Sequence, residues 1–365
     1  MQDKKVLIIG LGLIGGSLAK ALRERIGIKN IAAFDNDINA LSNALDDGII
    51  SKVCKSVTDY VSEADIIFLC TPVKTSIEYL KIIAKSVNKN CVITDVCSTK
   101  SEITNCIKSM ADPPNFIGGH PMSGSEKAGY AASSSHLFEN AYYVLTPISS
   151  SGDECLSIMT EIVKRIGAIP IIIDAEEHDK ITAAISHVPH IIASALVNMI
   201  EDIDSSDGRM RLLAAGGFKD ITRIASSSPQ MWESIILSNK QKISDMLDTF
   251  IKYLYEFKKS VELSDSSSIF SFFDKARLYR AKIPDAKKGL IEPSYEIVVD
   301  VVDKPGIIGK ITTILGNNGI NIKNINVSNS REYEQGCLRI TLTDSSSVKA
   351  AYDVLTSHGY KVYKK

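Results

Sequence analysis

Residues 6–17 read Val6-Leu7-Ile8-Ile9-Gly10-Leu11-Gly12-Leu13-Ile14-Gly15-Gly16-Ser17. Here an apolar run leads into a G-x-G-x-x-G pattern, and a helix-like segment follows over residues 18–26. In this pattern the first glycine allows a tight turn, the second lets a pyrophosphate approach the backbone, and the third lets the helix pack on the strand. The N–H groups at the start of the helix then face the phosphates. The stretch predicts a dinucleotide site with these contact residues: Gly10, Leu11, Gly12, Leu13, Ile14 and Gly15.

A second signal is needed, because a lone glycine pattern also occurs in turns that bind nothing. The next apolar run, residues 30–34, ends in Asp35, which lies 20 residues beyond Gly15. An acidic side chain at this place accepts a hydrogen bond from the ribose 2′-hydroxyl and repels a 2′-phosphate. No Arg or Lys follows in residues 36–39. We therefore expect NAD rather than NADP.

Composition limits the classes of protein to which the chain can belong. Its 365 residues predict two or three domains, and 44% hydrophobic and 23% charged residues are ordinary for a globular protein. A net charge of −1 gives no reason to expect nucleic acid or an anionic membrane as partner. No unbroken apolar run reaches the roughly 18 residues of a membrane span, and no signal peptide is expected. Seven cysteines without a C-x-x-C pattern predict reduced thiols and a cytoplasmic protein.

The N-terminal part, residues 1–173, alternates apolar strand-like runs with amphipathic segments, which predicts an α/β doubly wound, Rossmann-like sheet. Several runs are apolar throughout, as in parallel strands covered on both faces. The expected strands are 6–10, 31–34, 66–71, 92–95, 115–118, 142–145 and 169–173. Ligands of such sheets bind beyond the carboxyl ends of the strands. Residues 71–73, 98–100 and 119–121 should therefore surround one crevice, with Thr71, Pro72 and Val73 touching the cofactor.

Residues 174–288 lack strand patterns and predict an all-helical domain. Helical spacing covers residues 176–202, 210–226, 229–263 and 268–281, with Ser228 as the N-cap before Pro229. The stretch 235–257 is apolar around more than one side, which favours either packing against a second subunit or one long helix in its own domain. Residues 284–289 resemble a linker. Residues 289–365 then follow a βαββαβ pattern, which predicts a small α+β ferredoxin-like domain.

Polar clusters follow the cofactor motif, and together they resemble one family. The sequences GLGLIGGS, TDVCSTK, GGHPMSGSEKAG, SHVPH and GGFKDITRIA begin at residues 10, 94, 118, 186 and 216. They resemble prephenate dehydrogenase, the oxidoreductase of tyrosine biosynthesis, in the form with a C-terminal ACT domain. Residues 303–306 and 318–322 carry the ACT resemblance. The likeness extends over essentially the whole chain.

The resemblance implies an NAD-dependent oxidative decarboxylation of prephenate to 4-hydroxyphenylpyruvate. His120 is then the base that accepts the substrate hydroxyl proton, because imidazole titrates near working pH. Ser98 would bond the same hydroxyl, although its position also predicts a helix N-cap. Arg223 would grip a substrate carboxylate bidentately. The further substrate-binding residues are His190, Ser186, Ser125 and Lys219, and Glu126 could pair with Arg223 or Lys219 in the empty site.

Several residues allow a second interpretation. His187 and His190 are spaced like zinc ligands, but the implied reaction needs no metal, so we expect none and take His187 as structural. Trp232 is expected to pack near the pocket mouth. His136, His178 and His358 are taken as surface or structural residues.

Alternatives to the main function remain open at this point. Arogenate, or both compounds in a cyclohexadienyl dehydrogenase, is the alternative substrate, and a non-catalytic amino-acid sensor is the alternative of another class. We expect a homodimer built on residues 229–263, with the ACT modules also able to pair. The ACT module should bind tyrosine, or else phenylalanine, although it could serve only to stabilise the dimer. Its expected contacts are Asp303, Pro305, Gly306, Asn318 and Asn321.

Overall fold

The computed structural model describes residues 1–365 except 125–126, 150, 284–294, 303, 329–336 and 365. Backbone contacts divide the chain into two units, residues 1–289 and 290–365. The expected linker at 284–289 lies outside the described residues. Each unit is described by itself.

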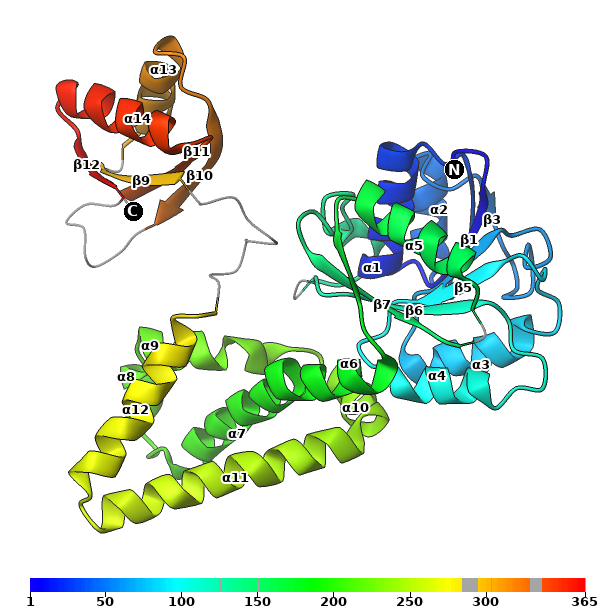
Figure 1. The fold of residues 1–365 in the computed structure, drawn as a ribbon, viewed down its shortest axis with the longest axis horizontal. Helices are drawn as coiled ribbons and strands as arrows, with labels where there is room; N and C mark the ends of the chain where they lie inside the picture. Colours follow the sequence, from blue (N-terminus) through cyan, green and yellow to red (C-terminus); the bar gives the residue numbers. More distant parts are fainter. Residues whose placement is uncertain (125–126, 150, 284–294, 303, 329–336, 365) are drawn as a thin grey trace. The chain divides into compact units, whose positions relative to one another are not determined.

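The first unit begins with an eight-stranded sheet in the order β3-β2-β1-β4-β5-β6-β7-β8 (Figure 1). The order reverses direction at β1, so β1 and β4 flank the crevice where doubly wound folds bind ligands. The strands are β1 Lys5–Ile9, β2 Asn30–Phe34, β3 Lys52–Val53, β4 Ile66–Leu69, β5 Val92–Asp95, β6 Phe116–Pro121, β7 Tyr142–Pro147 and β8 Ile169–Ile172.

The sheet departs from the sequence prediction in two places. Strand β7 runs antiparallel to β6, with His120 opposite Val144, whereas every other neighbouring pair is parallel. A parallel return needs a long crossover, usually a helix, and between these strands the described residues form only a short 3-10 turn, Tyr130–Ala132. The edge strand β3 was missed because its two residues are exposed and carry no apolar pattern.

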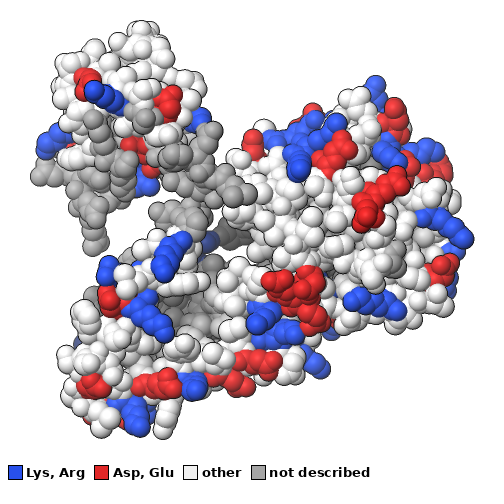
Figure 2. Space-filling view, in the orientation of Figure 1, with Lys and Arg blue, Asp and Glu red and all other residues white. Residues whose placement is uncertain are grey.

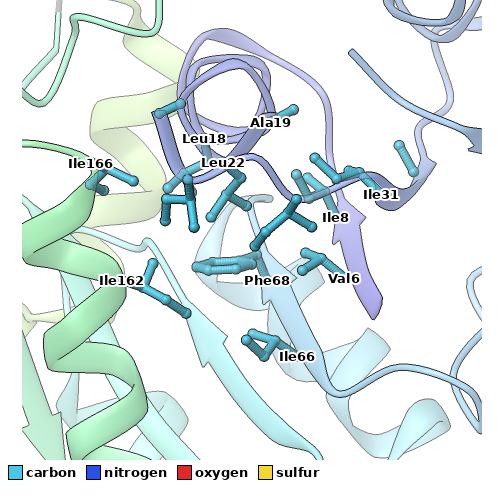
Figure 3. Packing of buried hydrophobic residues seen from close by; sticks show 14 of the residues in the cluster. Val6, Ile8, Leu18, Ala19, Leu22, Ile31, Ile66, Phe68, Ile162 and Ile166 are labelled. Atoms are coloured by element: carbon cyan, nitrogen blue, oxygen red, sulfur yellow. The ribbon is translucent and has the colours of Figure 1, made fainter. Parts of the chain in front are cut away.

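Helices cover both faces of the sheet, which explains the continuously apolar strands. The helices are α1 Leu13–Ala21, α2 Ile38–Asp46, α3 Val73–Ile83, α4 Ser101–Lys108 and α5 Asp153–Arg165, and a π-helical turn, Leu22–Ile26, extends α1. Val6 and Ile8 of β1 pack on one face with Leu18 of α1 and Ile162 of α5 (Figure 3). The intervening Leu7 and Ile9 pack on the other face with side chains of α3 and α4.

The rest of the first unit is helical. Its elements are α6 Ala175–Thr182, a π-helical turn Ala183–His187, α7 Val188–Ile203, α8 Arg209–Leu213, α9 Gly216–Thr222, a 3-10 turn Arg223–Ser226, α10 Pro229–Ser238, α11 Lys240–Glu262 and α12 Ser266–Arg280. Ser228 caps α10 as expected, by accepting from the Met231 N–H. The helix expected over 210–226 is instead three short pieces, since Ala214 and Ala215 are extended and glycines disfavour helix. The helix expected over 229–263 breaks at Asn239.

By length and composition alone, the continuous helix over residues 175–203 could cross a membrane, with a mean hydropathy of 1.5 in its best window. Polar residues interrupt its apolar side chains, so the sequence has no unbroken apolar run here. Asp179 and His178 near its start are fully buried against the sheet domain and hydrogen-bonded to it. The start of this helix is therefore packed inside the protein.

The second unit forms the expected βαββαβ module. Its elements are β9 Tyr295–Asp300, α13 Ile307–Asn317, β10 Ile322–Ser328, β11 Cys337–Leu342, α14 Ser345–Ser357 and β12 Lys361–Lys364. The antiparallel sheet has the order β10-β11-β9-β12. Ile297 and Val299 of β9 pack with Ile311 of α13 and Leu355 of α14 in a separate small core.

Charge is distributed without a dominant sign. On the face seen in Figure 2, basic and acidic side chains are interspersed, with wide uncharged areas between them. This matches the net charge of −1 and offers no basic stripe on that face for a polyanion.

Candidate active site

The glycine turn at the end of β1 is built for close packing at two positions and for open space at the third. Gly10 has φ +96°, and a Cβ there would lie 2.6 Å from the Cys70 carbonyl oxygen. A Cβ on Gly15 would overlap the Gly10 carbonyl oxygen. A Cβ on Gly12 would meet nothing within 4 Å. The backbone at Gly12 is therefore open to a ligand, at the N-cap of α1, where the first N–H groups of a helix lack intrahelical partners.

The other expected cofactor residues of this turn surround that opening. Leu11 is fully buried, while Leu13 and Ile14 open α1 and are half-buried. The half-buried Asp35 at the end of β2 accepts hydrogen bonds from the Leu11 N–H at 2.5 Å and the Asp37 N–H at 2.7 Å. The carboxylate is thus fixed beside the glycine turn. These features fit a dinucleotide.

The ends of β4 and β5 meet beside the turn. Pro72 is the N-cap of α3 and Val73 is its buried first residue. The Thr71 hydroxyl lies 2.9 Å from the Ser76 hydroxyl. The Cys97 thiol donates to the Thr71 carbonyl oxygen at 3.5 Å, which joins the loop after β5 to the loop after β4. The predicted grouping of these strand ends is therefore present.

A buried ion pair beneath the site was not predicted. Lys100 and Asp95 are both fully buried and bonded to each other. The Lys100 ammonium also donates to the Gly119 carbonyl oxygen at 2.8 Å, and Asp95 accepts from the Gly119 N–H at 3.1 Å. The pair holds the backbone immediately before His120. TDVCSTK contains both residues, so the sequence held the signal, but nothing in it showed that they pair.

His120 lies on β6 and is half-buried. Its Nδ1 is 2.8 Å from Nε2 of His178, a buried residue of α6. Burial, and then the nearby His178, Lys100 and His187, hold the pKa of His120 well below its ordinary value of 6.5. The imidazole is therefore neutral near neutral pH and able to accept a proton. His178, interpreted from sequence only as a surface or structural residue, is the partner that the sequence analysis missed.

Ser98 lies in the loop after β5, as expected, but it is not a helix N-cap. Helix α4 begins at Ser101, and the N-cap position, Lys100, makes no side-chain cap. The cap comes instead from Asp179 of α6, whose carboxylate accepts from the Lys100 and Ser101 N–H groups at 2.7 Å each. A local pattern cannot show a cap supplied from 78 residues away. Ser98 is half-buried and is not used by the helix end.

His190 and Trp232 form a second polar and aromatic group. Their rings stack at 3.9 Å between centroids, tilted by 31°. His190 Nδ1 lies 2.8 Å from the Ser186 carbonyl oxygen, one turn earlier. Burial lowers the pKa of His190, and the positive charge of Arg223 lowers it further, against the opposing hydrogen bond to Ser186. The expected packing role of Trp232 therefore has a definite partner.

Of the remaining candidates for substrate binding, the structure describes Arg223 and Lys219 but not Ser125. Arg223 is exposed at the start of the 3-10 turn after α9, close enough to His190 for its charge to act on that ring. Lys219 is exposed on α9. Ser125 and Glu126 lie outside the described residues, and so does any pairing of Glu126 with Arg223 or Lys219.

His187 lies close enough to His120 to lower its pKa, but its hydrogen bond goes to Asn239. It is buried beside Asn239, whose amide nitrogen is 3.2 Å from His187 Nδ1. Burial lowers the pKa of His187 to about 4. Across the described part of the chain, no three His, Cys, Asp or Glu side chains group as metal ligands.

The second unit has a cavity of about 630 Å³ at the turn before α13. Pro305 and Gly306 line it together with Lys304, Lys310 and Lys361. Asn318 and Asn321 are not among its lining residues, and the Asn318 amide donates to the Ile314 carbonyl oxygen of its own helix. Asp303 lies outside the described residues.

Comparison with known proteins gives one family along the chain. Residues 18–172 match the prephenate dehydrogenase nucleotide-binding domain, residues 174–275 the prephenate dehydrogenase dimerization domain, and residues 295–359 the ACT domain. Prephenate dehydrogenase of Bacillus subtilis (strain 168) is 38% identical over 96% of this chain and 95% of its own length. Prephenate dehydrogenase of Lactococcus lactis subsp. cremoris is 37% identical over 96% of this chain and 97% of its own.

This chain is also similar in structure to a solved prephenate dehydrogenase. The prephenate dehydrogenase of Aquifex aeolicus, crystallised with hydroxyphenyl propionate and NAD⁺, superposes with a TM-score of 0.72 at 30% identity. The superposition covers 78% of this chain and 99% of that one.

Proposed function

The chain belongs to the prephenate dehydrogenase family, and from that premise we propose how its own residues perform and regulate the reaction. It is an NAD-dependent oxidoreductase that converts prephenate to 4-hydroxyphenylpyruvate, with an ACT domain that fits regulation. These matches therefore support an enzyme rather than the alternative of a non-catalytic amino-acid sensor. When bound, NAD supplies the hydride acceptor, and the open backbone at Gly12 with the fixed Asp35 carboxylate suits it.

His120 is proposed as the base, and the observation that carries the proposal is its half-buried ring near the end of β6, hydrogen-bonded to His178. His120 would accept the substrate hydroxyl proton while the carbon that bears this hydroxyl gives up a hydride, which NAD would accept when bound. Loss of CO₂ then makes the ring aromatic, and the proton returns to the ring oxygen, so the step releases no net proton. Ser98, beside the same crevice and not used as a cap, orients the hydroxyl.

Arg223 is proposed to bind a carboxylate of the dianionic substrate, since a guanidinium matches that group with two parallel hydrogen bonds. Lys219, Ser125 and Ser186 would complete the substrate contacts. His190, held by Ser186 and Trp232, faces the substrate side chain.

Prephenate is proposed over arogenate as the preferred substrate. Arogenate carries an ammonium group, which calls for an anionic partner. Among the described residues, the charge that acts on the His190 ring is the positive charge of Arg223. A neutral imidazole next to a guanidinium suits a keto acid.

We further propose a cytoplasmic homodimer. Residues 174–275 match a dimerization domain, and large apolar side chains are exposed on its helices, among them Leu212, Leu254 and Phe270 at 81%, 50% and 72%. Such a surface on one chain marks a protein interface. The seven cysteines are all free thiols, as in a reducing compartment.

Tyrosine, or else phenylalanine, is proposed as the effector bound by the ACT domain. The cavity before α13 combines helix N–H groups at Gly306 with the lysines that line it, which suits the carboxylate of an amino acid.

The proposal is tested by NADH formation with prephenate and arogenate, each with NAD and with NADP. The highest specificity constant is expected for prephenate with NAD. A higher constant for arogenate would overturn the substrate assignment and leave the family assignment intact.

A further inference from the structure

Three side chains form a hydrogen-bonded row from the sheet into the helical domain. His120 Nδ1 lies 2.8 Å from His178 Nε2, and His178 Nδ1 lies 2.8 Å from Asp179 Oδ1. His178 is 1% exposed and Asp179 is fully buried. Water therefore does not compete for these bonds, and the protons along the row are set by the three groups themselves.

The far end of the row is an ionised carboxylate. Burial alone would raise the pKa of Asp179, but hydrogen bonds from His178, Ser101 and Lys100 outweigh it and lower that pKa. The two backbone donors belong to the start of α4 and lie at 2.7 Å. A carboxylate only accepts hydrogen bonds. The hydrogen between His178 and Asp179 is therefore on His178 Nδ1.

That hydrogen fixes the protons on both rings. In a neutral imidazole one nitrogen donates and the other accepts, so we take His178 Nε2 as the acceptor. His120 Nδ1, which faces it, must then carry its ring's hydrogen. The lone pair of His120 is left on Nε2, for which no hydrogen-bond partner occurs among the described residues.

We propose that His178 and Asp179 are positioning residues that hold His120 in its Nδ1–H tautomer, so that Nε2 is the atom that accepts the substrate proton. This inference rests on the proposed role of His120 as base. In the reaction the substrate O–H bond breaks and the Nε2–H bond forms. The resulting imidazolium donates Nδ1–H to His178, and Asp179 stays ionised.

The same two residues also connect several elements of the site. Asp179 caps α4, directly after the loop that carries Ser98, and its backbone carbonyl oxygen accepts from the Asn239 amide at 2.8 Å. His178 contacts the base from the adjacent position. One turn of α6 therefore sets the orientation of the base and the position of the neighbouring loop together.

The first test measures the tautomer without any turnover. The full-length enzyme is labelled with ¹⁵N-histidine, and long-range proton–nitrogen couplings are recorded above pH 7, with His120→Asn used to assign the signals. We expect the His120 hydrogen on Nδ1. A hydrogen on Nε2 overturns the inference, since it would mean that a protonated His178 donates to His120.

The second test separates positioning from structural support. His178→Gln keeps an acceptor near the position of Nε2, whereas His178→Phe keeps the ring and removes the acceptor. We expect His178→Phe to lower kcat by roughly 10²-fold with little change in KM, as when the group orienting a catalytic histidine is lost. His178→Gln should restore most of kcat and the Nδ1–H tautomer. His187→Gln, which removes another buried histidine, should leave the tautomer unchanged.

The pH dependence of kcat/KM is a further measurement, and a loss of packing alone would not shift it. The charged and titratable groups facing His120 are His178 of α6, His187 of the following turn and Lys100 before α4. Among the residues that the structure describes, only His178 is hydrogen-bonded to His120. His178→Phe should therefore shift the acid limb of kcat/KM by more than His187→Gln does.

The outcomes remain distinguishable if one variant fails. If His178→Phe does not fold, the His120 tautomer of the wild type and the kcat of His178→Gln still test the inference. Equal loss of kcat in the Gln and Phe variants, with an unchanged tautomer, would mean structural support only and would overturn the inference. Near-normal turnover of His120→Asn would instead remove the proposed base itself.

Discussion

Gly12→Ala and Gly15→Ala should have opposite effects, although the two glycines are three residues apart in one motif. At Gly15 a methyl group overlaps the Gly10 carbonyl oxygen and lies 3.0 Å from the Cys70 Cβ. Gly10 cannot move aside cheaply, because its N–H is bonded to the Phe34 carbonyl oxygen at 2.8 Å and its own φ is +96°. Overpacking of this kind costs about 1–3 kcal/mol. The helix-propensity gain of alanine over glycine, about 1 kcal/mol, offsets only part of it.

At Gly12 the balance is different. A methyl group there has no neighbour within 4 Å, and the backbone is extended at φ −75°. Alanine is a poorer N-cap than glycine, but it also restricts the unfolded chain, and these effects of roughly 0.5–1 kcal/mol oppose each other. Stability without cofactor should therefore change little. The methyl group would instead meet the pyrophosphate of NAD, and a clash of about 1–3 kcal/mol weakens binding by about 5- to 150-fold.

The assay is thermal unfolding with and without NAD, together with calorimetric titration of NAD. Gly15→Ala should unfold at lower temperature without cofactor. Gly12→Ala should unfold like the wild type without cofactor and lose the stabilisation that bound NAD provides. The reasoning would be refuted by a Gly12→Ala protein that binds NAD normally, or by equal loss of stability in both variants.

Further expected outcomes concern cofactor choice, the base, the substrate clamp and regulation. Asp35→Ser combined with Asn36→Arg should narrow the preference for NAD over NADP by at least about tenfold, measured as the ratio of specificity constants; equal use of both cofactors by the wild type would contradict the role of Asp35. His120→Asn should lower kcat by roughly 10²–10⁴-fold. In the wild type, the pKa of His120 is depressed, so kcat/KM should fall with acidification only below pH 6.5. Arg223→Ala should raise KM by roughly 10- to 150-fold, the value of a lost charged hydrogen bond, with kcat less affected. A chain ending near Lys288 should stay active and lose inhibition by tyrosine; inhibition that persists and competes with prephenate would place the effector in the catalytic pocket.

Local patterns predicted much of the architecture because their causes are local. The strand periods, the glycine turn, the Ser228 cap and the βαββαβ order all depend on residues within one or two elements. The direction of β7 was harder to predict from the sequence. Its apolar run fits either direction. The lack of a crossover helix among the described residues between β6 and β7 becomes decisive only once the sheet is assembled.

The residues of the candidate site also fall into two groups: those that local sequence indicates and those that depend on distant contacts. His120 and Asp35 stand out by residue type and by position after a strand. His178 does not, because a histidine in a helix gives no sign of what it will face. Asp179 caps a helix 78 residues earlier in the chain, and Ser98 resembled a cap only until the start of α4 was known.

By itself the sequence determined the order of the elements, the dinucleotide turn and the residue types available for proton transfer and anion binding. These follow from backbone sterics and side-chain chemistry at neighbouring positions. Only the tertiary structure decided that Lys100 pairs with Asp95 beneath His120, and that His178 and Asp179 form a hydrogen-bonded row with it. Partners distant in sequence become neighbours through burial and hydrogen bonding, and in a buried row each proton is decided by the group facing it.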